Sequence, residues 1–308
     1  MVTPEVASVV TRFAPSPSGL LHVGHAYAAT IASQTARDDD TGRFLLRIED
    51  IDIGRCRLEF ETAIVEDLAW LGLQWEEPVR RQTDHMDDYA AALVQLENAD
   101  LLYRCFCTRA QIKAEIAGAD RAPHGPEGPV YPGTCRLLSR AESDARKAAG
   151  APFALRLDMA AAIGRAGPLT WHDQTRGTIA AQPNQFGDAV IARKDVPTSY
   201  HLSVTVDDHL QGVTLVTRGV DLFEATHVHR LLQALLGFEP PRYAHHPLLI
   251  GGDGKRFAKR NHAATLRAMR NVGVKADDLR AALASDESER LHTLIDVAEG
   301  ATDTNHRP

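Results

Sequence analysis

Long apolar runs are missing from this 308-residue sequence. No stretch approaches the roughly 18 consecutive apolar residues of a membrane-spanning helix. The opening Met1-Val2-Thr3-Pro4-Glu5 also lacks the basic and then apolar segments of a secretory signal peptide. The sequence therefore predicts a cytoplasmic protein with no membrane partner.

An excess of positive charge is also missing, because the formal net charge is −7. This balance argues against a protein that binds nucleic acid indiscriminately through phosphate contacts. Short basic segments remain at Arg193-Lys194 and at residues 255–260. With 44% hydrophobic and 24% charged residues, the chain is an ordinary globular sequence with room for about two domains.

Cysteine is scarce: there are four, and three of them fall between Cys105 and Cys135. This distribution is poor for a secreted disulfide framework. The thiols of Cys105, Cys107 and Cys135, with the phenol of Tyr131, could form a tetrahedral zinc site. Spacing alone leaves buried reduced thiols equally open, and Cys56 stands apart as an ordinary thiol.

A strand–helix–strand unit is predicted at the start of the chain. Residues 9–14 and 44–48 have strand character, and residues 26–36 between them are rich in helix-forming alanine. Apolar residues with helical spacing follow at 59–71 and 87–103. These patterns are typical of a layered α/β domain.

A segment rich in glycine and proline, residues 117–133, interrupts this pattern and precedes a predicted strand at 153–157. We expect residues 104–185 to be an insertion. We expect the sheet to be completed by residues 188–192, 200–210 and 213–217. After it, the sequence predicts a helix at 226–236, a last helical region at 263–284 and a frayed end from residue 299.

The most informative segment runs from Arg12 to His25. A strand passes through a stiff Pro/Ser/Gly turn into a helix start that carries His22 and His25. Helix N-termini favour phosphate, and two imidazoles three residues apart can donate to one phosphate group. Gly24 would let a base or ribose approach the backbone. In isolation, such a pair would be read as surface histidines on a proline-bounded loop.

A second nucleotide signal is the glycine-bounded basic segment 251–260. Its glycines would allow the loop to close over a triphosphate, where Lys259 could neutralise charge on the leaving pyrophosphate. Taken alone, this segment would be read as a basic surface turn.

Together these segments resemble the signatures of class I aminoacyl-tRNA synthetases. His22-Val23-Gly24-His25 resembles the first motif, and the preceding Arg12 to Ser16 is similar to the glutamyl and glutaminyl branch. Residues 251–260 occupy the place of the KMSKS loop; Lys259 matches its second lysine, while Arg256 and Ala258 replace the first lysine and the serine. The resemblance covers about residues 8–284.

This resemblance implies an α/β fold: a Rossmann-like parallel sheet with an inserted zinc-containing α+β subdomain and a C-terminal helical region that resembles a stem-contact domain. The implied parts are the first half of the catalytic domain at 1–103, the insertion at 104–185, the second half at 186–245, and the KMSKS-like loop with C-terminal helices at 246–308.

The resemblance also implies residue roles. Glu49, in the run Arg47-Ile48-Glu49-Asp50-Ile51-Asp52, would hold the α-ammonium group of glutamate, and Arg12 would pair with its side-chain carboxylate. Four further residues would line the amino-acid pocket: Ala14, Ser16, Tyr200 and Arg218. From their sequence context alone, Tyr200 and Arg218 could equally be a packing tyrosine and a surface arginine.

The implied ATP-binding residues are His22, Gly24, His25, Arg256 and Lys259. Of these, His22, His25 and Lys259 would be catalytic, because they would stabilise charge at the α-phosphate and on the departing pyrophosphate. Magnesium would accompany ATP. The arrangement C-x-C followed by Y-x-x-x-C resembles the zinc site of glutamyl-queuosine tRNA(Asp) synthetases, which implies one structural zinc on Cys105, Cys107, Tyr131 and Cys135.

Among class I enzymes, the glutamyl-queuosine tRNA(Asp) synthetases are similar in extent, because the sequence stops soon after the second motif and we expect no anticodon-binding region. The implied enzyme is a monomeric ligase that activates L-glutamate with ATP, without tRNA. It then transfers glutamate to queuosine at the wobble position of tRNA(Asp).

Three alternatives stay open at this stage. The chain could be a short glutamyl-tRNA synthetase that charges a tRNA 3′ end. It could be another H-x-x-H nucleotidylyltransferase, although that class lacks the pocket of Arg12 and Glu49 and the cysteine insertion. It could also be a catalytically inactive RNA-binding relative, for which the replacements at Arg256 and Ala258 are the only hints.

Overall fold

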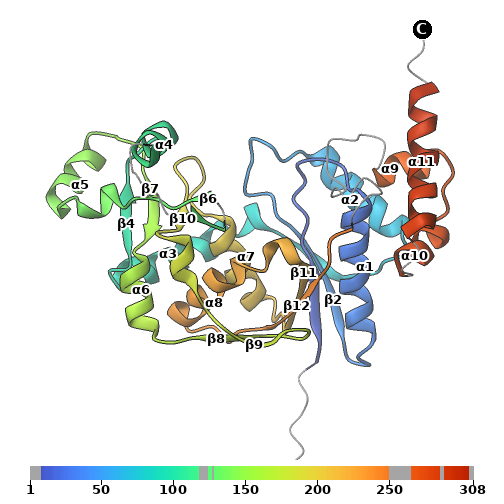
Figure 1. The fold of residues 1–308 in the computed structure, drawn as a ribbon, viewed down its shortest axis with the longest axis horizontal. Helices are drawn as coiled ribbons and strands as arrows, with labels where there is room; N and C mark the ends of the chain where they lie inside the picture. The colour runs from blue at the N-terminus through green and yellow to red at the C-terminus, as the bar shows by residue number, and fades with distance from the viewer. Residues whose placement is uncertain (1–7, 118–123, 127, 250–264, 285–287, 305–308) are drawn as a thin grey trace, which may run out of the picture. The chain divides into compact units, whose positions relative to one another are not determined.

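The computed structural model describes residues 8–117, 124–126, 128–249, 265–284 and 288–304. The chain forms two compact units (Figure 1). The first consists of residues 1–84, 213–221 and 244–308, and the second of residues 85–212 and 222–243.

A parallel sheet in the order β1-β2-β3 forms the centre of the first unit. Its strands are β1 (Val10–Phe13), β2 (Arg43–Ile48) and β3 (Glu76–Arg81), joined by helices α1 (Val23–Arg37) and α2 (Leu58–Trp70). The segment before β11 (Leu215–Gly219) lies along β1, where Thr214 donates to the carbonyl of Val10 over 3.0 Å. The predicted strand–helix–strand unit and parallel α/β sheet are confirmed.

Alanines on one face of α1 let this helix pack closely on the sheet, because Ala26, Ala29 and Ala32 are at most 1% exposed. The same apolar core includes residues of the C-terminal helices α9 (Leu266–Asn271), α10 (Ala276–Ala284) and α11 (Ser288–Thr304). The single helical region predicted at 263–284 is therefore divided, with Gly273 at φ 83° between α9 and α10. The prediction of a frayed end from residue 299 was wrong, because α11 continues to Thr304.

The second unit begins with α3 (Met86–Asn98) and contains an antiparallel sheet in the order β10-β7-β4. These strands are β4 (Leu102–Cys105), β7 (Ala154–Leu157) and β10 (Val190–Ala192). The helix predicted over 87–103 was too long: Asp100 adopts a left-handed conformation, φ 54°, and the chain turns there into β4. The run at 188–192 joins this antiparallel sheet instead of the parallel one.

The remaining elements of the second unit are short. They are α4 (Arg109–Ala117), β5 (His124–Gly125), β6 (Gly128–Pro129), α5 (Arg140–Ala148), α6 (Met159–Ala166), β8 (Thr170–Asp173), β9 (Gly177–Ala180) and α8 (Ala225–Leu236). The helix predicted at 226–236 is confirmed by α8. Strand β12 (Arg242–His246) begins in this unit, where Tyr243 pairs with Asp173 in parallel.

Residues 200–210, predicted as part of the sheet, form helix α7 (Tyr200–Leu210) instead. Ser199 caps this helix by accepting a hydrogen bond from the backbone N–H of Leu202 over 3.4 Å. Every residue from His201 to Asp208 is buried, so apolar and polar residues do not separate onto two faces. A helix buried all round lacks the amphipathic period, and its Val-Thr-Val segment imitates the alternation of a strand.

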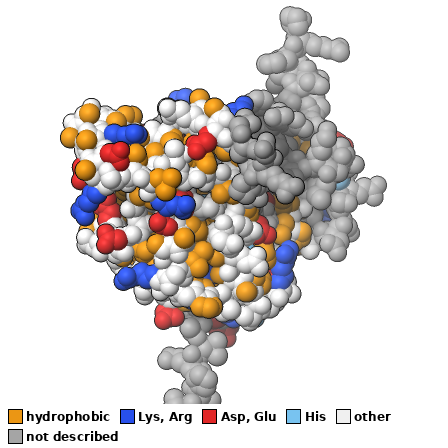
Figure 2. Space-filling view, turned by 60° about the vertical axis from the view of Figure 1, so that its left-hand side comes forward, with side chains coloured by type: hydrophobic (Ala, Val, Ile, Leu, Met, Phe, Trp, Pro, Cys, Tyr) orange, Lys and Arg blue, Asp and Glu red, His pale blue; other side chains and the backbone are white. Residues whose placement is uncertain are grey.

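No helix in the described part of the chain is both long and apolar enough to cross a membrane. In Figure 2, positive and negative side chains of the described residues are interspersed with apolar ones over the visible face.

Candidate active site and cysteine cluster

His22 and His25 form the N-terminal cap of α1. The Nδ1 atom of His22 accepts from the backbone N–H of Gly24 over 3.1 Å, and the Nδ1 atom of His25 accepts from the N–H of His22 over 3.2 Å. A ring nitrogen that accepts carries no proton, so the proton of each neutral imidazole lies on Nε2. The two rings lie 3.9 Å apart, which places two Nε2 donors together at a helix N-terminus.

Gly24 makes this cap possible. A Cβ atom at this position would lie 2.9 Å from Cε1 of His22, closer than real Cβ contacts allow. The glycine therefore leaves room for the imidazole to fold back over the first turn of α1.

Two buried arginines come from adjacent segments of the first unit. Arg12 on β1 is 5% exposed, and its Nη1 donates to the carbonyl of Thr217 over 3.2 Å. Arg218, the next residue on β11, is 6% exposed and donates from Nε to Nε2 of His245 over 3.1 Å. Arg12 thus contacts the residue directly before Arg218, so the two arginines lie on neighbouring segments. Buried guanidinium groups of this kind suit an anionic ligand.

Glu49 follows β2 directly and pairs with Arg47, whose side chain is fully buried. The Nη2 of Arg47 lies 3.1 Å from Oε1 of Glu49 and the Nε lies 3.3 Å from the same oxygen. A carboxylate has about four lone-pair positions, so one fixed in this way retains the capacity to accept from an ammonium group.

The segment after β1 is tied to the segment after β2. The N–H of Glu49 donates to the carbonyl of Pro15 over 3.0 Å, and the N–H of Arg57 donates to that of Pro17 over 3.0 Å. Ala14 and Ser16, both predicted pocket residues, belong to the first of these segments. Ser16 Oγ lies 3.6 Å from the thiol sulfur of Cys56. Four predicted site residues, Arg12, Ala14, Ser16 and Glu49, thus follow or end adjacent parallel strands.

Tyr200 begins α7 in the second unit and lines a cavity of about 410 Å³. Its ring packs edge-on against that of His229, with centroids 5.6 Å apart. The cavity is also lined by Tyr131, Phe186 and Arg156, and the guanidinium carbon of Arg156 lies 3.8 Å above the centre of the Tyr131 ring. The cavity therefore combines aromatic faces with a cation.

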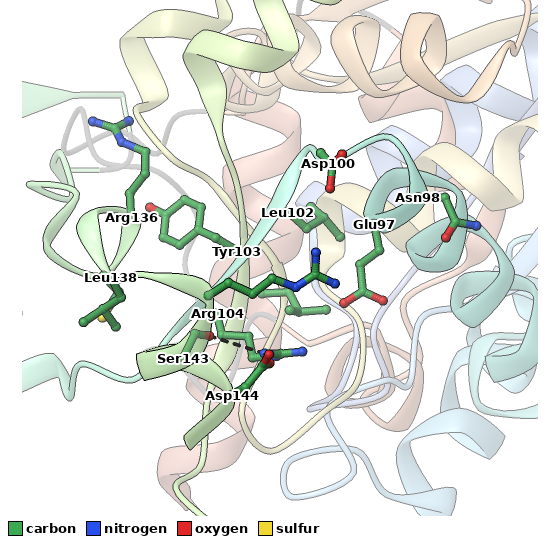
Figure 3. Close-up of a pocket in the computed structure, with 13 residues that line it drawn as sticks. Glu97, Asn98, Asp100, Leu102, Tyr103, Arg104, Arg136, Leu138, Ser143 and Asp144 are labelled. Carbon is green, nitrogen blue, oxygen red and sulfur yellow. Dashed lines mark hydrogen bonds and ion pairs between the residues drawn. The ribbon is translucent and has the colours of Figure 1, made fainter. Parts of the chain in front are cut away.

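A second cavity of the same unit, about 470 Å³, lies among residues of α3, β4 and α5 (Figure 3). Arg104 points across it and donates to the carboxylate of Asp144 over 2.6 Å. Of the predicted site residues, Cys135 is the one that lines this cavity.

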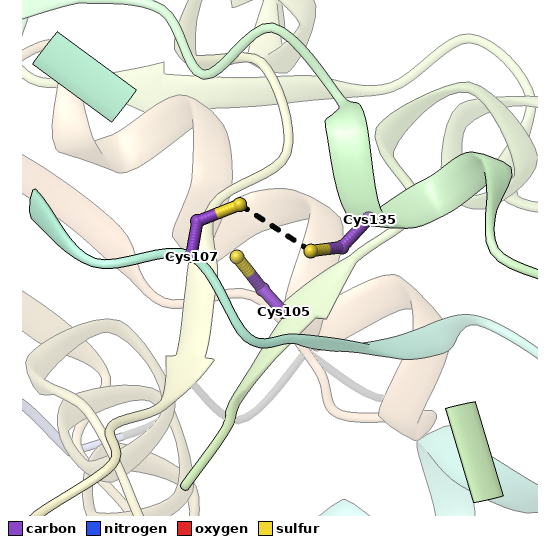
Figure 4. Close-up of side chains that lie close together, drawn as sticks. All are labelled: Cys105, Cys107 and Cys135. Atoms are coloured by element: carbon purple, nitrogen blue, oxygen red, sulfur yellow. Dashed lines mark hydrogen bonds between the residues drawn. The ribbon is translucent and has the colours of Figure 1, made fainter. Parts of the chain in front are cut away.

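The three thiols predicted to bind zinc meet in the second unit (Figure 4). The sulfur atoms of Cys105, Cys107 and Cys135 all lie within 4.8 Å of one another, and those of Cys107 and Cys135 are 3.4 Å apart. Zinc–sulfur bonds of about 2.3 Å in tetrahedral geometry place sulfurs about 3.8 Å apart. The Tyr131 hydroxyl oxygen lies 3.4 Å from Cys105 Sγ and 3.6 Å from Cys107 Sγ, so the four predicted side chains lie close together. The three thiols form a possible metal site.

The thiols of this cluster differ in their readiness to ionise. Burial raises the pKa of Cys107 to about 11. Burial would also raise the pKa of Cys135, but hydrogen bonds from the Phe106 N–H, the Tyr131 hydroxyl and Cys107 outweigh it and lower that pKa. The thiolate is the form that binds a metal, so Cys135 is the better prepared ligand.

Two predicted ATP-binding residues, Arg256 and Lys259, lie outside the described residues. Two residues that contact predicted glutamate-binding residues were not predicted from the sequence. Arg47 pairs with Glu49, and His245 accepts a hydrogen bond from Arg218. Arg47 stands in the same acidic run as Glu49 and could have been found as its counter-charge. His245 is distant in sequence, and nothing in its neighbourhood indicates the contact.

Residues 8–290 match the sequence model of the tRNA synthetases class I (E and Q), catalytic domain. The chain belongs to this family. It is therefore an enzyme of the aminoacyl-tRNA synthetase type, a ligase, and the resemblance predicted from its motifs is confirmed.

Similar proteins include the glutamyl-Q tRNA(Asp) synthetase of Rhodobacter capsulatus, 46% identical over 88% of this chain and 98% of that protein. The glutamate–tRNA ligase of Aquifex aeolicus is 37% identical over 89% of this chain, but over 56% of its own length. Among solved structures, a glutamate tRNA ligase from Elizabethkingia meningosepticum has a TM-score of 0.69 and 28% identity, covering 82% of this chain. The chain spans about half the length of that ligase, 52%.

Proposed function

We propose that this synthetase activates L-glutamate with ATP in the absence of tRNA, and then transfers glutamate to queuosine at the wobble position of tRNA(Asp). The observation that carries the proposal is that buried Arg12, the carboxylate of Glu49 and the His22–His25 cap all lie in or directly after the β1–α1–β2 segment of the first unit. The relatives support queuosine as the acceptor, because the chain matches 98% of the length of a protein named glutamyl-Q tRNA(Asp) synthetase.

Glutamate would be recognised at both ends of the molecule. Its side-chain carboxylate would pair with the guanidinium of Arg12, with Ala14, Ser16 and Arg218 completing the pocket in the first unit. Its α-ammonium group would donate to Glu49, whose carboxylate Arg47 fixes over 3.1 Å. A ligand that must satisfy a cation and an anion a set distance apart is selected by both charge and length.

ATP would lie against the N-terminus of α1. The Nε2 atoms of His22 and His25 would donate to phosphate oxygens, and Gly24 would leave room for the His22 ring over the first turn of α1. The α-carboxylate of glutamate would attack the α-phosphorus atom, and pyrophosphate would leave with Mg²⁺. Arg256 and Lys259 would stabilise the leaving charge. In the second step, a hydroxyl of the queuosine cyclopentene ring would take the glutamyl group from AMP.

The cavity beside Tyr200 supports an unpaired nucleoside as the acceptor. Single-stranded bases are recognised by stacking on aromatic rings and on arginine. Tyr200, Phe186 and Arg156 supply such surfaces around a cavity of about 410 Å³. Zinc bound by Cys105, Cys107, Tyr131 and Cys135 would stabilise the wall that carries Tyr131. We further propose that the protein is a cytoplasmic monomer. We also propose that its domain boundaries lie at residues 103, 185 and 245, as the sequence indicates.

Exchange of labelled pyrophosphate into ATP tests the first step. Without any tRNA, we expect exchange with glutamate, and little with glutamine or aspartate. Glutamine offers Arg12 no negative charge, and aspartate is one methylene too short to reach Arg12 and Glu49 together.

Exchange that requires tRNA would contradict the proposed order of steps, and exchange that prefers glutamine would contradict the role of Arg12. A chain that exchanges with no amino acid would be an inactive RNA-binding relative.

A further inference from the structure

Asp67 on α2 is a buried carboxylate whose presence needs an explanation. Its side chain is 0% exposed, and neither carboxylate oxygen accepts a hydrogen bond within the described part of the chain. The nearest cation is Arg270 of α9, whose Nη2 lies 3.5 Å from Oδ1. A buried charge with so little compensation destabilises a fold, so packing alone does not account for it.

Arg270 connects this carboxylate to the flank of α9. The same guanidinium nitrogen lies 3.0 Å from Glu66, and Arg267, one turn earlier, lies 3.9 Å from Glu66. Glu66 is 48% exposed, so its two ion pairs contribute little by themselves. The buried Asp67 and the exposed Glu66 therefore share the guanidinium group of Arg270.

The N-terminal end of α9 lies against the histidine motif. Thr265 pairs with His22 in an isolated antiparallel bridge, and the N–H of Leu266 donates to the carbonyl of Leu21 over 2.9 Å. Thr265 also caps α9 by accepting from the N–H of Ala268 over 3.2 Å. In sequence, Thr265 follows the proposed ATP-binding Lys259 by six residues. One short helix thus joins Asp67 to the histidine motif.

We propose that Asp67 is a positioning residue for ATP: through Arg270 it fixes α9, and through Thr265 and Leu266 the geometry of His22. This assignment rests on the proposed function, because it assumes that His22 and Lys259 bind ATP. Asp67 itself does not touch the substrate.

The charge state of Asp67 supports this assignment. Burial raises the pKa of Asp67 to about 6, against the opposing effect of Arg270 and Arg267 and with a small contribution from Glu66 in the same direction as burial. A carboxylate whose pKa is higher in the folded than in the unfolded state lowers stability above that folded pKa and not below the unfolded one, near pH 4. Asp67 therefore lowers stability above about pH 6.

The test is Asp67→Asn, assayed by equilibrium binding of ATP and, separately, of glutamate. We expect ATP affinity to fall by about tenfold, since small displacements of binding groups have effects up to about 10²-fold. Glutamate affinity should stay unchanged, and the melting temperature above pH 6 should equal or exceed that of the wild type. A purely structural role would lower stability and both affinities together.

Two further variants sharpen this experiment. Arg270→Lys keeps a positive charge but loses the planar fork, so it should repeat the selective loss of ATP affinity if Asp67→Asn does not fold. The control is Asp278→Asn, which removes an exposed ion pair with Arg290, 3.0 Å long, between α10 and α11 and should leave ATP affinity unchanged. The difference in ATP affinity between wild type and Asp67→Asn should also vanish below about pH 5, where Asp67 in the folded protein is protonated.

A wild-type chain that binds ATP and an Asp67→Asn variant with the same ATP affinity would overturn this assignment alone. A wild-type chain that does not bind ATP at all would overturn the proposed function and the assignment with it.

Discussion

Replacing Arg12 by alanine is expected to lower kcat/KM for glutamate in pyrophosphate exchange by about 10²–10³-fold. Arg12 is buried on β1 and held by the carbonyl of Thr217, so its guanidinium is already desolvated and oriented. Removing one partner of a buried charge pair costs about 2–5 kcal/mol, and each 1.4 kcal/mol is about tenfold. The substrate carboxylate would be left without its counter-charge.

Two companion variants separate binding from folding. Arg12→Lys retains the charge but not the bidentate fork, so its kcat/KM should lie between those of Arg12→Ala and the wild type. Arg43→Ala removes an exposed arginine of the neighbouring strand, which pairs with Glu76 over 2.6 Å, and should leave kcat/KM near the wild-type value. An Arg12→Ala enzyme with wild-type kcat/KM would place the glutamate carboxylate elsewhere.

Zinc removal is expected to have the second largest effect. The purified protein should hold about one zinc per chain, and Cys107→Ser should lose it, because the cluster of Cys105, Cys107, Tyr131 and Cys135 then lacks a thiolate. Structural zinc contributes about 10–16 kcal/mol to the folding of small zinc-finger peptides. We expect chelation or Cys107→Ser to lower the melting temperature of the second unit markedly.

Metal analysis and thermal unfolding, with and without chelator, check this prediction. Cys56→Ser is the matched control, because Cys56 is also a free thiol but lies outside the cluster, beside Ser16. It should keep the full metal content. A wild-type chain without metal, whose stability does not respond to chelation, would show that the cluster consists of reduced thiols only. Equal metal content in Cys107→Ser and wild type would remove Cys107 from the ligands.

Local patterns predicted the first unit well for a physical reason. Strands β1 and β2 carry buried apolar residues and α1 is rich in alanine, so propensity and burial favour the same structure in these segments. Strand β3 has the polar sequence Glu-Glu-Pro-Val-Arg-Arg, and it was not predicted from the sequence. The position of Glu49 at the end of β2 follows from the same reasoning, because functional groups gather where parallel strands end.

The errors arise where tertiary contacts override the local pattern. Helix α7 is buried on all sides, so its sequence lacks the helical period that prediction relies on. Helix α11 continues past residue 299 to Thr304, and Ala298 just before this end is 0% exposed in the core, a contact that an alanine in a polar segment does not reveal. The pair of Arg218 and His245 joins β11 to β12 across 27 residues, which no local pattern encodes.

Transfer of the glutamyl group to queuosine can be measured in a single assay. The enzyme is incubated with ATP, Mg²⁺ and labelled glutamate, together with matched tRNA pools from cells with and without queuosine. We expect label only in the queuosine-containing pool. Label in both pools would contradict this expectation and indicate charging of a tRNA 3′ end.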